Sequence, residues 1–121
     1  MEARVIRGGN VEVAETEWGS LQWLVGGGGG GDAGIRMTFG RVTFKPGQAN
    51  PAHRHPNCDE LLFVVAGAIE HSLPEGGTTI LRAGDGIILP RGQKHQARNA
   101  GSGEAVVVVA YNSAKRETLE E

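Results

Sequence analysis

The chain has 121 residues, with 12 lysines and arginines against 14 aspartates and glutamates, and a net charge of −2 at pH 7. This length suits one domain, and the longest basic cluster is the Lys115-Arg116 pair, which argues against a nucleic-acid surface or a polybasic membrane patch. Cys58 is the only cysteine, which excludes an intramolecular disulfide framework. Without an apolar signal core or a stretch of ~18 apolar residues, we expect a cytoplasmic protein with no membrane partner.

The first third of the chain is polar and rich in glycine. Residues 1–25 are predicted to form an N-terminal arm and the first strands, ending in an apolar cluster around Trp18 and Trp23. Residues 26–34 contain six consecutive glycines, which supply no side chains to a core and cost backbone entropy to order, so they predict a flexible loop. This run lacks the Gly-Lys-Ser/Thr ending of a phosphate loop.

Residues 35–112 are predicted to form the core of a β-barrel. Ile35, Met37 and Phe39 alternate with polar residues, a pattern typical of a half-buried strand. Residues 61–66 are apolar at both parities, so both faces of that strand are expected to be covered.

The second half of the chain shows further strands divided by turn signals. A turn signal at 74–77 separates two strands of a predicted hairpin, 69–73 and 78–81, and 106–111 is a final strand rich in β-branched residues. Residues 113–121 are predicted to be a tail, either one short helical turn or frayed. Short strands roughly every ten residues, without helical periodicity, indicate an all-β barrel or sandwich.

Three of the four histidines fall in two polar clusters that have the composition of a metal site. His53 and His55 are two residues apart, so on a strand their imidazoles share a face about 6.6 Å apart and can converge on one ion with bonds near 2.1 Å. Glu60 follows a turn signal on the neighbouring strand, and His95 follows a second turn. Three imidazoles and one carboxylate suit a divalent transition metal such as Fe, Mn, Ni or Zn, and contain too much nitrogen for Ca or Mg.

The spacing of both clusters resembles the two conserved motifs of the cupin superfamily. All ten defining positions match in type and spacing: Gly47, His53, His55, Glu60 and Gly67 in the first, and Gly84, Pro90, Gly92, His95 and Asn99 in the second. Only sixteen residues separate the two motifs, as in the small single-domain microbial members. The resemblance implies a single cupin barrel (a double-stranded β-helix or jelly roll) with an N-terminal arm, in which His53, His55, Glu60 and His95 bind one metal ion.

The resemblance also implies a homodimer and a small-molecule ligand. Trp18, Trp23 and strand 61–66 are the expected contributors to the dimer interface. The fold alone does not select a function. We favour a metal-dependent enzyme of the dioxygenase, isomerase or lyase type that acts on a small polar organic substrate, with Glu60 as its catalytic residue. The alternatives are a non-catalytic module that binds a sugar or carboxylate beside a structural metal, and a storage or structural barrel.

Other polar residues have weaker signals. We expect His71 to be exposed or hydrogen-bonded, Cys58 to be a small packed residue, and Asp59 to point away from the site because it neighbours Glu60 on a strand. Gln96 and Tyr111 are candidates for a hydrogen bond near the site. Three arginines on or beside strands would anchor a carboxylate only if they faced inward, and most strand arginines face solvent: Arg36, Arg41 and Arg98. The pocket is expected to be lined by Met37, Phe39, Phe63 or its neighbours, and Val107 or Val109.

Overall fold

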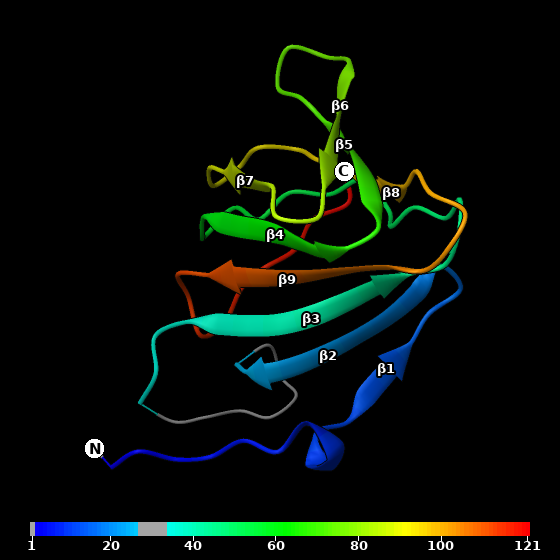
Figure 1. Ribbon diagram of the computed structural model, residues 1–121. Helices are drawn as coiled ribbons and strands as arrows, with labels where there is room; N and C mark the ends of the chain where they lie inside the picture. Colours follow the sequence, from blue (N-terminus) through cyan, green and yellow to red (C-terminus); the bar gives the residue numbers. More distant parts are fainter. Residues whose placement is uncertain (1, 27–33) are drawn as a thin grey trace.

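The computed structural model describes residues 2–26 and 34–121, so residues 27–33 of the predicted glycine-rich loop lie outside the described residues. The described chain is all-β, as predicted, and its one other regular element is a 3-10 turn at Gly8–Asn10. Its two antiparallel sheets contribute to a single core cluster (Figure 1). Within these residues, no helix is long and apolar enough to cross a membrane.

In the described part of the chain, the larger sheet has six strands in the order β1-β2-β3-β9-β4-β7, and the smaller has three in the order β6-β5-β8. Strands β5 and β6 pair as the predicted hairpin around residues 74–77. The strand bounds are β1 Val13–Glu15, β2 Gly19–Val25, β3 Thr38–Phe44, β4 Glu60–Ala66, β5 Ala68–Ser72, β6 Thr78–Arg82, β7 Gly86–Leu89, β8 Ala97–Asn99 and β9 Ala105–Tyr111.

Strand β9 lies in the middle of the larger sheet, between β3 and β4. Its run of four valines favours a pleated strand, and alternate residues from Ala105 to Tyr111 are buried. On β3 the buried residues include Thr38, Val42 and Phe44. The predicted parity of this segment was therefore wrong by one residue: Met37 is 41% exposed, because a shift of one position moves every side chain to the opposite face of a sheet.

Strand β4 has one covered and one open face. The predicted coverage of both faces is not met within the single chain: Leu61, Phe63 and Val65 are 50%, 43% and 49% exposed, and Ile88 beside them on β7 is 73% exposed. The opposite face carries Leu62 and Val64, which are buried in the core. The smaller sheet contributes to that core, whereas nothing in the described chain covers the outer side.

All four glycines of the motifs adopt a positive φ, which side chains disfavour, and Gly67 and Gly92 show why. Gly67 has a φ of 83° where β4 turns into β5, and a Cβ there would lie 3.0 Å from Ala105. Gly92 has a φ of 81°, and its N–H donates to the carbonyl of His55 at 2.8 Å. Since glycine adopts a positive φ without steric cost, these residues allow the turns that bring the two motifs together.

Residues 113–121, which we call the C-terminal strap, leave β9 and pair with a distant part of the chain. The backbone of Leu119 exchanges two 2.9 Å hydrogen bonds with Arg54 in an isolated antiparallel bridge. Asn57 binds the strap through the Lys115 carbonyl and the Glu117 N–H. The prediction of a helical turn or a frayed tail was therefore wrong. The proposed division into arm, loop, barrel and tail stays a prediction.

Candidate metal centre

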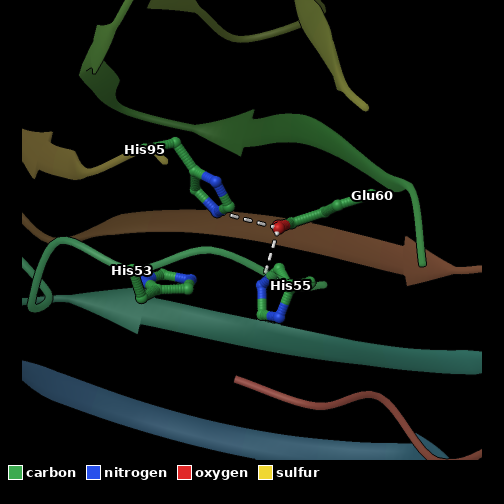
Figure 2. Close-up of side chains that lie close together, drawn as sticks. All are labelled: His53, His55, Glu60 and His95. Atoms are coloured by element: carbon green, nitrogen blue, oxygen red, sulfur yellow. Dashed lines mark ion pairs between the residues drawn. The ribbon is translucent and has the colours of Figure 1, made fainter. Parts of the chain in front are cut away.

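The structure brings together the four residues predicted to bind a metal. His53, His55, Glu60 and His95 each offer one ligand atom, and these atoms lie within 4.8 Å of one another (Figure 2). Glu60 begins β4 and His95 precedes β8. The backbones of His53 and His95 exchange hydrogen bonds of 3.0 and 2.8 Å, which hold the two motifs side by side. His53 lies in this isolated bridge rather than in the regular strand that the spacing predicted.

Backbone carbonyls orient all three imidazoles of the site. A carbonyl can only accept a hydrogen bond, so each ring carries its proton on Nδ1 and, when neutral, presents a bare Nε2. Such outer hydrogen bonds fix the tautomer of metal-binding histidines. The acceptors are the carbonyls of Pro51 for His53 at 2.7 Å, Glu117 for His55 at 2.9 Å and Gln93 for His95 at 2.9 Å.

The atoms at the centre of this site lack hydrogen-bond partners in the described chain. Nε2 of His55, Nε2 of His95 and Oε1 of Glu60 are buried without one. Oε1 of Glu60 lies 3.3 Å from the His55 nitrogen and 3.1 Å from the His95 nitrogen, as Figure 2 shows. Neutral imidazole lone pairs and a carboxylate repel one another unless a cation lies between them. Ligands bonded at about 2.1 Å to one ion lie about 3.0 Å apart when adjacent, so the site fits a transition metal.

The electrostatics of the cluster agree with a cation site. Burial raises the pKa of Glu60, but its contacts with His55 and His95 outweigh burial and lower this pKa to about 2. Burial lowers the pKa of His53 to about 4, so this ring is neutral at pH 7. Burial also lowers the pKa of His95, but Glu60 outweighs that effect and raises it. Without a metal, a proton on His95 can therefore occupy the place of the cation.

The ligand set opens onto a cavity of about 190 Å³. Val107, Val109 and Leu62, which is a neighbour of Phe63, line it as predicted, whereas Met37 and Phe39 do not. Trp18 and Trp23 also line the cavity, where they contact Phe44 and Tyr111. Their place in a dimer interface stays a prediction.

Arg116 of the strap is a cavity residue that the sequence analysis missed. Its guanidinium lies 4.2 Å from the Trp23 ring centroid and 5.2 Å from that of Tyr111. In the described part of the chain Arg116 forms no ion pair with a carboxylate. No local signal marked it, because the strap contacts residues about sixty positions earlier. The three arginines predicted as candidate anchors do not line the cavity: Arg36 and Arg41 are exposed, and Arg98 pairs with Glu70 at 3.0 Å.

The remaining predicted residues are also placed by the structure. Tyr111 is buried in the cavity wall, with its ring 5.0 Å from that of His55. Gln96 is exposed and donates to the carbonyl of Asn50. Cys58 is a packed residue, and burial raises the pKa of its thiol, which disfavours the reactive thiolate. Asp59 points away from the site and accepts hydrogen bonds of 2.9 Å from the Arg91 backbone N–H and from the Asn112 amide.

The comparisons with known proteins agree with this geometry. The family profile described as Cupin domain matches residues 40–111. Oxalate oxidase 1 of Hordeum vulgare is 37% identical over 86 residues, covering 65% of this chain and 43% of the relative. Germin-like protein 1-1 of Oryza sativa subsp. japonica is 34% identical over 83 residues, covering 65% and 38%. The chain thus spans less than half the length of these curated relatives.

Solved structures show the same fold. A structure of oxalate oxidase in complex with the substrate analogue glycolate has a TM-score of 0.65 at 31% identity, covering 69% of this chain and 45% of that one. A polyketide cyclase from Streptomyces resistomycificus has a TM-score of 0.79 at 20% identity, covering 99% and 85%. At that identity, the second similarity concerns the fold alone.

Proposed function

Since this chain belongs to the cupin family, we propose that it is a metal-dependent enzyme that acts on a small carboxylate. The observation that carries the proposal is the convergence of three bare imidazole nitrogens and an ionised carboxylate on one point beside the cavity. A divalent ion from the set Fe, Mn, Ni or Zn suits these ligands. A relative at 37% identity is named as an oxalate oxidase, which supports an oxidoreductase acting on a short acid.

The residues around the site would have different roles in such an enzyme. His53, His55, Glu60 and His95 would hold the metal, which supplies polarisation of a coordinated oxygen. Arg116 lines the same cavity and offers donors to a carboxylate. Trp18 and Trp23 exclude water and limit the size of the ligand.

The catalytic role predicted for Glu60 stays a prediction. Its pKa of about 2 makes its carboxylate a weak proton acceptor, which favours the role of ligand over that of base.

The test is turnover of short acids by protein loaded separately with each metal. We expect at least one loaded form to consume oxalate, with oxygen uptake and release of carbon dioxide, or glycolate, with oxygen uptake and formation of glyoxylate. Metal-stripped protein and the Glu60→Gln variant should be inactive. Turnover that survives in both would refute a metal-dependent reaction. Binding of either acid without turnover by any metal form would instead favour the non-catalytic binding module.

We also propose that the chain forms a homodimer through the open face of β4. The exposed side chains there form an apolar group on adjacent strands, which we call the outer patch: Leu61, Phe63, Val65 and Ile88. Contiguous exposed apolar surface of this kind marks interaction sites in soluble proteins. Sedimentation analysis should give a dimer for the natural chain and a monomer for Phe63→Lys. A natural chain that sediments as a monomer at high concentration would contradict the dimer.

A further inference from the structure

His71 is a buried histidine of the cavity that the proposed metal site does not use. It lies on β5, paired with Thr79 on one side and Ala97 on the other, and its relative exposure is 0%. It lines the cavity that also holds the four proposed ligands, and its ring stacks 5.8 Å from that of His95 at an interplanar angle of 20°. It does not belong to the group of side chains whose ligand atoms converge on one point.

The tautomer of His71 follows from the one hydrogen bond that its ring makes to the described residues. Nδ1 lies 2.9 Å from the carbonyl oxygen of Ser72, which can only accept, so the proton is on Nδ1. Burial lowers the pKa of His71, which keeps the ring neutral. Nε2 is therefore a bare acceptor, and it is buried without a partner in the described part of the chain. A buried acceptor of this kind destabilises the protein unless a donor from a ligand or water reaches it.

Arg116 and His71, two polar residues of the cavity wall, suit two different parts of a ligand. Arg116 offers hydrogen-bond donors and a positive charge, which suit a carboxylate. His71 offers only an acceptor, which suits a hydroxyl or another protonated group. Fully ionised oxalate carries acceptors alone, so it leaves Nε2 of His71 unsatisfied. A site that hydrogen-bonds a substrate hydroxyl discriminates strongly against analogues that lack it.

We propose that Nε2 of His71 accepts a hydrogen bond from the ligand, so that this site selects short hydroxy acids over acids without a donor. This inference rests on the proposed function, since it specifies the substrate class of the same cavity. His71 is thus a specificity-determining residue that contacts the ligand rather than the metal.

The test is calorimetric binding at pH 8 of glycolate, acetate and oxalate to metal-loaded protein, for the natural chain and for His71→Leu. Glycolate and acetate differ only by a hydroxyl. Any direct effect of the metal on that hydroxyl is present in both proteins and cancels in the comparison. We expect His71→Leu to weaken glycolate binding by roughly five- to tenfold, the size of one hydrogen bond, and to leave acetate and oxalate within about twofold.

Two further measurements separate a contact with the ligand from a structural role. His71→Gln retains an acceptor in its side-chain amide and should recover part of the affinity for glycolate. If His71→Leu does not fold, the same binding comparison is made with His71→Gln. Both variants should bind one metal per chain, and removal of an unsatisfied acceptor should leave the melting temperature of the metal-free protein unchanged or higher in His71→Leu.

The outcomes distinguish this inference from the proposed function. An equal loss of affinity for all three acids, or no loss for glycolate, with metal content intact would overturn the role of His71 while leaving the metal enzyme standing. Failure of the natural chain to bind metal would refute the proposed function instead. Metal-loaded natural chain that does not bind glycolate overturns the inference.

Discussion

Four histidines line one cavity, and each donates its Nδ1 proton to a backbone carbonyl, but only three of them converge with a carboxylate. At the cluster, Glu60 adds a negative charge among bare nitrogens, and the group requires a cation. On β5, His71 presents the same bare nitrogen without a convergent carboxylate, so a neutral donor satisfies it. In this comparison the carboxylate, rather than the imidazole or its tautomer, distinguishes the proposed metal site from the proposed ligand-binding acceptor.

Removal of that carboxylate should have the largest effect. Glu60→Gln leaves three imidazoles with no charge to balance a dication, and we expect the affinity for metal to fall at least about 100-fold in competitive titrations with a chelator. Asp59→Asn is the matched control, because this neighbouring carboxylate binds Arg91 and Asn112 outside the site. Equal losses in the two variants would mean that general electrostatics, rather than coordination, holds the metal.

Removal of the metal should have the second-largest effect, a loss of thermal stability. An ion present at 100 times its dissociation constant stabilises the native state by about 2.7 kcal/mol, which corresponds to a melting temperature higher by about 10 °C for a domain of this size. Scanning calorimetry of stripped protein with Mn, Ni or Zn added back checks this. Magnesium is the control, since a nitrogen-rich site disfavours it. A melting temperature raised equally by magnesium would contradict a site built from imidazoles.

Loosening of the strap should affect one of the three cluster histidines and not the other two. His55 alone depends on a carbonyl of the strap, that of Glu117. Leu119→Pro removes the N–H that donates to Arg54, so it should loosen the strap and weaken metal binding by about tenfold, the usual size of an outer-shell effect. Glu121→Gln, which alters only an exposed ion pair with Arg54, should have no effect. Unchanged metal affinity in Leu119→Pro would show that the strap does not orient His55.

The smallest expected effect is a pH dependence of the metal-free protein. The pKa of His53 is about 4 in the native state and 6.5 in an unfolded chain, so between these values the unfolded chain binds more protons. The free energy of unfolding should therefore fall as the pH decreases from 6.5 towards 4, by about 1 kcal/mol once the partial exposure of the ring is considered. The raised pKa of His95 acts in the opposite sense above pH 6.5. Urea unfolding of the natural chain and His53→Gln between pH 7 and 4.5 checks this: a difference that does not vary with pH would contradict it.

The proposed ligand set was predictable from sequence because motif spacing places its members directly. Gly67 and Gly92, both at positive φ, allow the turns that bring the histidines and the glutamate of the two motifs together. The all-β architecture was predictable from the same turn-forming glycines.

The phase of the strands and the role of the tail were not predictable by these arguments. Alternation reveals a period of two but not which parity faces the core, so Met37 was assigned inward and lies outward. An all-apolar strand such as β4 hides the phase entirely. The strap has neither periodicity nor a turn signal, because its backbone pairs with Arg54 and its function depends on contacts distant in sequence.

X-ray absorption spectroscopy of the one-metal complex tests the central claim most directly. The account predicts one ion per chain, surrounded by three imidazole nitrogens and at least one carboxylate oxygen at about 2.0–2.2 Å, with one imidazole lost in His55→Gln. A first shell of oxygen atoms alone, or a spectrum that His55→Gln leaves unchanged, would contradict it.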